Sequence, residues 1–186
     1  MPTLTDTLFP RFVDIIIEHE GGARFVNHPS DPGGATKWGI SLSYARYQKA
    51  RFDLDGDGDV DADDIRVLTR EQAIEAYRDG FWTPARCGEL PPGLALSVFD
   101  MAVNQGQGAA VRALQRAVGA TVDGAIGPRT VAKAKGHNDP AAVMSEFLVQ
   151  RVKRYSEIDA HRLATFGTGW FRRAVAIDRQ STTLLN

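Results

Sequence analysis

The sequence has little cysteine and no long hydrophobic run. Cys87 is the single cysteine among 186 residues, which excludes an internal disulfide framework and a cysteine-based metal site. Apolar runs such as Ile15-Ile16-Ile17 are far too short to span a bilayer, so no stable membrane insertion is expected. The first residues, Met1 to Asp6, lack the basic and apolar segments of a secretory signal, and the chain is therefore expected to stay in the cytoplasm where it is made.

Basic residues are absent from one segment and in excess elsewhere. The formal net charge is −1, yet residues 53–64 contain seven aspartates and no lysine or arginine. The rest of the chain keeps 16 acidic residues against 22 basic ones, a formal charge of +6. Such a body suits an anionic polymer as partner. No basic run with interleaved aromatic residues is present, so no nucleic-acid partner is expected.

Apolar residues at three- and four-residue spacing dominate the chain and predict a mainly α fold. Leu8, Phe12 and Ile16 mark an amphipathic helix that ends at Gly21-Gly22. Residues 23–40 are rich in glycine, proline, asparagine and aspartate, so at most a short β-hairpin is expected there. Further helices are expected over residues 41–51, 69–78, 94–106, 110–118, 139–155 and 170–179.

Two carboxylates and a threonine follow the first helix at short intervals. Glu20 comes after the apolar helix and before two glycines, which lets backbone and substrate approach its carboxyl group closely. An apolar setting keeps a carboxylic acid protonated, as a proton donor to a glycosidic oxygen must be. Asp31 lies in a turn sequence, Asp-Pro-Gly-Gly, and Thr36 follows five residues later, so both are candidates to orient a water molecule. Glu18 is a rival acid that lacks the adjacent glycines.

The whole run from Glu20 to Ser41, EGGARFVNHPSDPGGATKWGIS, resembles the opening signature of glycoside hydrolase family 108, which comprises phage endolysins and related bacterial N-acetylmuramidases. The resemblance implies a lysozyme-like helical fold and hydrolysis of the β-1,4 bond between N-acetylmuramic acid and N-acetylglucosamine, with Glu20 as the catalytic acid. By analogy with the Glu–Asp–Thr triad of phage-type lysozymes, Asp31 and Thr36 take the other two roles. Trp38 is a candidate to stack on a sugar face.

Four segments of the C-terminal half resemble the predicted peptidoglycan-binding segment that is usually joined to this family: residues 100–106, 114–115, 122–130 and 169–170. Asn104 is the polar residue that we place in the sugar cleft, and the alternative is an asparagine that caps the helix before Gly106. The resemblance suggests a catalytic lysozyme-like lobe over residues 1–90 and a peptidoglycan-binding-like lobe over residues 91–186, packed as one globular unit. A peptidoglycan glycan strand is the implied partner, and a monomer is expected.

The aspartate-rich segment has the spacing of a calcium loop. Residues 53–64 place acids at positions 1, 3, 5, 9 and 12 and a glycine at position 6, and aspartate at position 12 resembles the loops of dockerin modules. Aspartates this dense repel one another unless a cation offsets them. One structural calcium ion is therefore expected, with position 7 contributing its backbone carbonyl. The ligands would be Asp53, Asp55, Asp57, Asp59, Asp61 and Asp64.

Other activities fit the same residues less well. A lytic transglycosylase would use the same acid without water and leave an anhydro sugar. A catalytically silent, calcium-stabilised wall-binding protein would not need the acid at all. A zinc amidase or peptidase is not expected, because His19, His28, His137 and His161 lack ligand spacing. A bacteriolytic enzyme without a signal would act in the periplasm or cell wall after release, with help from a holin if a phage encodes it.

Overall fold

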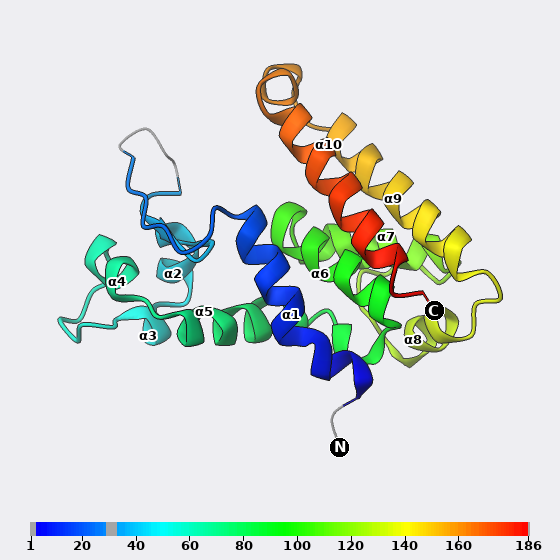
Figure 1. Ribbon diagram of the computed structural model, residues 1–186, viewed down its shortest axis with the longest axis horizontal. Coiled ribbons are helices and arrows are strands. Elements are labelled where there is room, and N and C mark those ends of the chain that lie inside the picture. Colours follow the sequence, from blue (N-terminus) through cyan, green and yellow to red (C-terminus); the bar gives the residue numbers. More distant parts are fainter. Residues whose placement is uncertain (1–2, 29–32, 186) are drawn as a thin grey trace. The chain divides into compact units, whose positions relative to one another are not determined.

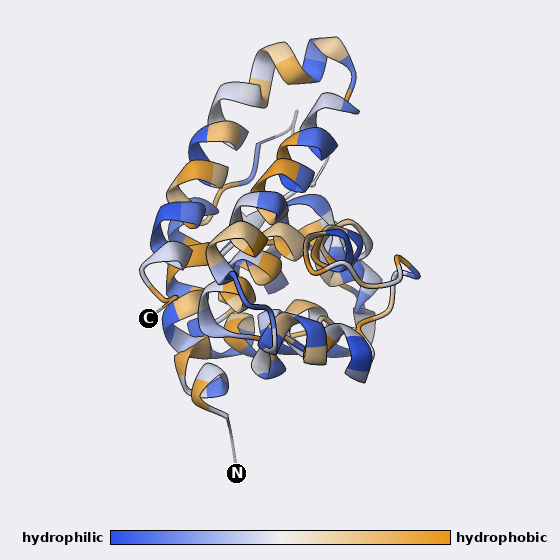
Figure 2. Cartoon of the chain, turned by 90° about the vertical axis from the view of Figure 1, so that its right-hand side faces the viewer, coloured by the Kyte–Doolittle hydropathy of each residue, from blue (hydrophilic) through white to orange (hydrophobic). Residues whose placement is uncertain are grey.

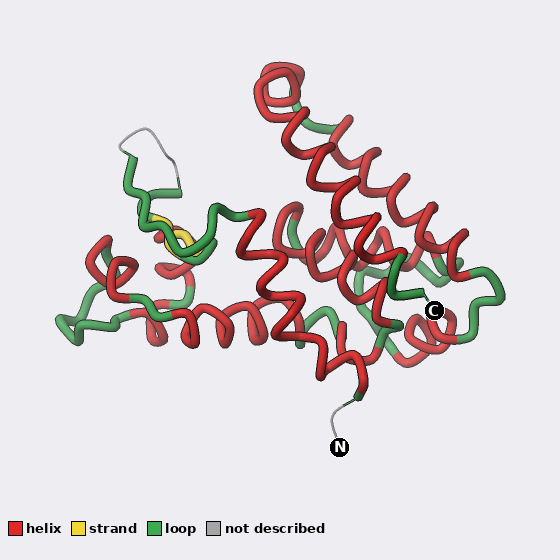
Figure 3. The backbone as a smooth tube through the Cα atoms, viewed as in Figure 1, coloured by secondary structure: helices red, strands yellow, loops and turns green. Residues whose placement is uncertain are grey.

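The computed structural model describes residues 3–28 and 33–185. Within them the regular secondary structure is helical apart from one two-stranded antiparallel hairpin and an isolated bridge from Val26 to Thr36, so the expected mainly α, lysozyme-like fold is confirmed (Figures 1 and 3). Every described helix is either too short or too polar to cross a lipid bilayer. The chain divides into two compact units, residues 10–78 and residues 1–9 with 79–186, which are described separately.

The smaller unit, residues 10–78, carries the hairpin and the aspartate-rich loop. Its elements are the C-terminal part of α1 (Leu4–His19), β1 (Thr36–Lys37), β2 (Ile40–Ser41), α2 (Leu42–Tyr47), α3 (Lys49–Phe52), α4 (Ala62–Val67) and α5 (Arg70–Tyr77).

Local chemistry explains the ends of several of these helices. Gly22 ends α1 by donating its N–H to the Ile17 carbonyl at 2.9 Å, with a φ of 75° that glycine adopts without strain. The expected capping box at α5 is present: the Thr69 side chain accepts from the Gln72 N–H, and the Gln72 side chain accepts from the Thr69 N–H. The single helix expected over residues 41–51 is instead two short ones, α2 and α3, separated at Gln48.

The larger unit is a helical assembly around α6. Besides the N-terminal part of α1, its elements are η1 (Arg78–Trp82) from Asp79 on, η2 (Cys87–Glu89), α6 (Pro92–Gln105), α7 (Gln107–Ala117), α8 (Pro128–Lys135), α9 (Pro140–Ser156) and α10 (Ala160–Thr182).

Helix α6 is buried on all sides from Gly93 to Ala102, which marks it as the centre of the core. Helices α7 and α10 pack on it, and α9 packs on both of them. The pair α9 and α10 runs side by side (Figure 1) and carries hydrophobic and hydrophilic residues along its length (Figure 2), as amphipathic surface helices do. Helix α10 begins about ten residues before its expected start.

A buried ion-pair network joins three of these helices. Asp100 of α6, with no exposed surface, binds Arg151 of α9 at 2.5 Å and Arg173 of α10 at 2.8 Å. The two arginines are only 2% and 9% exposed, so all three charges are held away from water. A buried charge is tolerated when it is paired, so the network fixes how α9 and α10 sit on α6.

Candidate active site

Glu20 lies directly after α1, where the helix ends, and its carboxyl-bearing side chain is half-buried. Its backbone N–H still donates to the Ile16 and Ile17 carbonyls at 3.0 and 3.1 Å, so the residue is held at the last turn. The side chain lies against Gly39: a Cβ added to that glycine would be 2.8 Å from the Glu20 Cβ and 3.0 Å from its Cγ. The fold therefore brings the candidate acid onto the turn of the hairpin.

The turn between β1 and β2 has an unusual backbone. Trp38 and Gly39 both have positive φ, 55° and 76°, as a two-residue turn of the primed type requires. For tryptophan this region costs about 1–3 kcal/mol, and such strain persists only where neighbours enforce it. Tyr77, which is buried, donates its hydroxyl to the Trp38 carbonyl at 3.1 Å and supplies that constraint.

Gly39 is required by space as well as by backbone angle. A Cβ there would lie 2.2 Å from the Tyr77 hydroxyl and would also press on Glu20. We expect Gly39→Ala to displace the Glu20 side chain or break the Tyr77 hydrogen bond, and so to lower activity by roughly tenfold or more and to lower Tm. Gly119→Ala, in the larger unit, is the matched control, because its φ is also positive, 65°, but no atom lies within 4 Å of the added carbon. Similar activity losses in the two variants, measured on purified peptidoglycan, would contradict a steric role for Gly39.

Thr36 is placed by the hairpin on which Glu20 rests. It pairs with Ser41 across the two strands, and its backbone exchanges hydrogen bonds with Val26 at 2.8 and 2.9 Å. Its hydroxyl, half-buried, donates to the Gly34 carbonyl at 3.3 Å, and the lone pairs of the hydroxyl oxygen can still accept a hydrogen bond. Asp31 lies outside the described residues.

Trp38 carries a second feature besides its strained backbone. Its indole Nε1 is buried and has no hydrogen-bond partner within the part of the chain that the structure describes. Most buried polar groups are paired, so this unpaired donor in the hairpin turn is consistent with a site that awaits a polar ligand. Trp82, by contrast, is buried between Phe9 and Phe99 and belongs to the core of the larger unit.

Asn104 lies in the larger unit, near the C-terminal end of α6. Its side chain is half-buried, and its Oδ1 accepts the Tyr155 hydroxyl at 2.8 Å. Tyr155 in turn accepts from Arg151 at 3.4 Å, so Asn104 is connected to the buried ion-pair network. Its expected role in binding sugar stays a prediction.

Backbone N–H groups of the aspartate-rich loop donate to the loop's own carboxylates. Gly58, at position 6, donates its N–H to Asp53 at 3.1 Å. Asp64, at position 12, is 1% exposed and accepts the N–H groups of Leu54 and Asp55 on one oxygen and that of Asp61 on the other. Burial opposes its ionisation, but these backbone donors together lower the pKa of Asp64, so the carboxylate is kept charged inside the loop.

Carboxylate oxygens gather in two groups within this loop. One oxygen from each of Asp53, Asp55 and Asp57 lies within 4.8 Å of the others, and the same holds for Asp59, Asp61 and Asp64. The neighbouring Asp57 carboxylate is the main cause that raises the pKa of Asp59, a sign of repulsion between like charges. One oxygen of Asp53, Oδ1, is buried without a hydrogen-bond partner among the described residues. This donor set fits a hard divalent cation such as calcium.

The loop is connected to the hairpin through α4, a link that the sequence did not reveal. The Lys37 ammonium donates a hydrogen bond at 2.6 Å to the backbone carbonyl of Arg66, which lies in the last turn of α4. The Arg66 guanidinium also lies 4.5 Å from the ring centre of Phe25. Helix α4 starts within the aspartate-rich loop, so this hydrogen bond connects the helix that follows the loop to strand β1.

The single cysteine of the chain is part of the core. Cys87 is fully buried in the larger unit, and burial raises the pKa of its thiol far above neutrality. Burial therefore disfavours a thiolate at this position.

Comparisons with known proteins identify the family. Residues 13–106 match the family described as glycosyl hydrolase 108, and residues 109–175 match the family described as a predicted peptidoglycan domain. The chain belongs to the glycosyl hydrolase 108 family and is a peptidoglycan hydrolase of the glycosidase class.

A solved structure, that of Brucella abortus SagA, is similar over nearly the whole length. The TM-score is 0.78 at 28% sequence identity, and the match covers 96% of this chain and 95% of that one. Among curated protein sequences, none matches the chain. The division of function at residue 90 stays a prediction, as do the roles of the individual site residues.

Proposed function

We propose that the enzyme is an N-acetylmuramidase that hydrolyses the β-1,4 bond between N-acetylmuramic acid and N-acetylglucosamine, with Glu20 as the general acid. The observation that carries the proposal is the contact of the half-buried Glu20 side chain with the strained Trp38-Gly39 turn. Glu20 would protonate the leaving oxygen, and the fixed turn would hold the carboxyl group in place while the bond breaks.

Asp31 and Thr36 are proposed to direct water at the anomeric carbon. Direct attack by water inverts the configuration, whereas a carboxylate close enough to form a covalent intermediate retains it. Nuclear magnetic resonance of the first-formed product distinguishes the two outcomes, and inversion is the expected result.

The bond that is cleaved can be identified from the products. Digestion of purified peptidoglycan should give muropeptides that end in reducing N-acetylmuramic acid. Anhydro-muramic ends, lighter by one water molecule, would identify a lytic transglycosylase instead. Reducing N-acetylglucosamine ends would place the cut at the other glycosidic bond, and no products at all would favour the wall-binding alternative.

We propose one structural calcium ion in the loop of residues 53–64. Asp53, Asp55, Asp57, Asp61 and Asp64 would hold it with carboxylates and Asp59 with its backbone carbonyl. The ion would offset the repulsion between the aspartates and so stabilise the loop and the start of α4. Because α4 binds Lys37 of the hairpin, the proposal links calcium to the position of the active-site turn.

Removal of calcium is expected to lower thermal stability. With the ion about 100-fold above its dissociation constant, binding adds about 2.7 kcal/mol, which corresponds to about 5–10 °C in Tm for a chain of this size. EDTA should therefore lower Tm by that amount, and added calcium should restore it. Asp53→Asn combined with Asp64→Asn should abolish the response, whereas Asp14→Asn, an exposed residue of α1, should keep it. An EDTA-insensitive Tm, with no calcium uptake by calorimetry, would refute the site.

We further propose that the enzyme acts as a monomer on the cell wall and causes bacterial lysis. The peptidoglycan-binding match supports the place of action. Clearing of outer-membrane-permeabilised Gram-negative cells tests this role. Release from the cytoplasm would depend on a holin if the chain is phage-encoded.

A further inference from the structure

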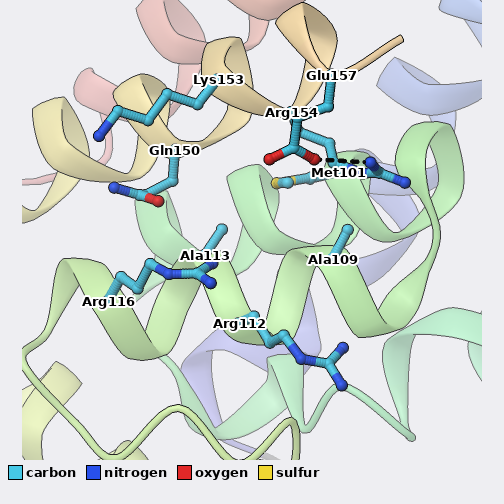
Figure 4. Close-up of a pocket in the computed structure, with 9 residues that line it drawn as sticks. All are labelled: Met101, Ala109, Arg112, Ala113, Arg116, Gln150, Lys153, Arg154 and Glu157. Atoms are coloured by element: carbon cyan, nitrogen blue, oxygen red, sulfur yellow. Dashed lines mark hydrogen bonds and ion pairs between the residues drawn. The ribbon is translucent and has the colours of Figure 1, made fainter.

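A basic pocket lies between α7 and α9 in the larger unit, and the proposed reaction makes no use of it. Its volume is about 480 Å³, in the range of pockets that hold small ligands. Met101 of α6 and alanines of α7 contribute apolar surface, and the charged residues around them are mostly cationic (Figure 4).

Two of the four cationic side chains around this pocket have a hydrogen-bond or ion-pair partner. Arg154 is paired with Glu157 at 2.8 Å, and Arg112 donates to the Gly108 carbonyl at 3.1 Å. Arg116 of α7 and Lys153 of α9 extend from the facing helices (Figure 4). Neither of these two side chains makes a hydrogen bond or an ion pair with any of the described residues, 3–28 and 33–185.

We propose that this pocket binds a carboxylate of the peptide stems of peptidoglycan, with Arg116 and Lys153 as its ligands. The inference rests on the proposed function for the identity of the polymer. In that polymer the stem peptides carry the free carboxylates, while the sugar hydroxyls and amides are neutral. A guanidinium binds a carboxylate through two parallel hydrogen bonds, and an ammonium adds a point charge. The apolar floor suits the methyl and methylene groups of an amino acid.

The position of the pocket favours this ligand over other anions. Both cationic ligands lie within residues 109–175, the segment that matches the predicted peptidoglycan domain. The pocket is also small and partly apolar, which suits one amino-acid residue better than an extended phosphate surface. Stem recognition here would add affinity for cross-linked wall without any contact with the reacting bond.

The test measures binding of full-length protein carrying Glu20→Gln to insoluble sacculi by co-sedimentation. Untreated sacculi are compared with sacculi whose carboxylates have been converted to neutral amides by a carbodiimide and an uncharged amine. The background protein should bind untreated sacculi about tenfold more tightly than amidated sacculi, the worth of one or two charge-assisted hydrogen bonds. Adding Arg116→Gln and Lys153→Gln should remove this preference and leave binding to amidated sacculi unchanged.

A matched pair of substitutions controls for net charge. Arg162→Gln with Arg172→Gln removes two exposed charges of α10 outside the pocket, and it should keep the tenfold preference. The proposal is overturned if the pocket pair keeps the preference or if the control pair loses it equally. Binding to anionic phospholipid vesicles is measured in parallel. The proposal is also overturned if the pocket pair weakens binding to these vesicles and leaves binding to untreated sacculi unchanged. Because the readout is binding, failure of the muramidase proposal would appear separately, as missing cleavage products from the enzyme with Glu20 intact.

Discussion

Glu20→Gln is expected to lower kcat on purified peptidoglycan by about 10²–10⁴-fold, the usual contribution of a general acid. Glutamine has the shape of glutamic acid but cannot donate the proton that the leaving oxygen needs. The side chain is half-buried against Gly39, and the isosteric change preserves that packing, so Tm should change little.

Glu18→Gln is the matched control for this substitution. Glu18 is exposed on the last turn of α1, two residues before Glu20, so its replacement changes the same charge in the same region. Its activity should stay within about twofold of the parent enzyme, as expected for a surface change. Near-full activity of Glu20→Gln, or an equal loss in Glu18→Gln, would remove Glu20 from its proposed role.

Asp100→Asn is expected to lower the free energy of unfolding by about 3–5 kcal/mol. The substitution leaves the guanidinium groups of Arg151 and Arg173 buried without their counter-charge, and an unpaired buried charge is strongly unfavourable. The expected fall in Tm is about 10 °C. Denaturant unfolding followed by circular dichroism measures the change.

Two further variants separate this explanation from a general effect of losing an aspartate. Asp14→Asn breaks an ion pair with Arg70 in which Asp14 is 52% exposed, and it should cost less than about 1 kcal/mol. Replacing the whole network with Asp100→Leu, Arg151→Met and Arg173→Met removes all three buried charges and should recover much of the lost stability. A triple variant as unstable as Asp100→Asn would contradict the electrostatic explanation.

Sequence patterns were sufficient where the physics is local. Three features depend only on neighbours a few residues apart: the end of α1 at two glycines, the capping box at Thr69 and the acid spacing of residues 53–64. The structure contains the first two as expected. Patterns failed where tertiary contacts override propensity. Gly167 and Gly169 are poor helix formers, yet α10 runs through both because it packs along α9 and α6.

The candidate site illustrates the same limit. Glu20 stood out from its glycine neighbours, but its contact with Gly39 joins residues 19 positions apart, and Tyr77 is farther still. Nothing in the spacing of Tyr77 on α5 distinguishes it from an ordinary core residue. Only the folded chain shows that its hydroxyl fixes the Trp38 carbonyl. The link from Lys37 to Arg66 is invisible in the sequence for the same reason.

The most direct test of Glu20 as proton donor compares two leaving groups. A dinitrophenyl glycoside of the muramic-acid-containing disaccharide departs without protonation, whereas the natural sugar needs a proton. Glu20→Gln should lose about 10²–10⁴-fold on peptidoglycan and less than about tenfold on the activated glycoside. Equal losses on both substrates would show that Glu20 serves the site in some other way and would contradict the proposed mechanism.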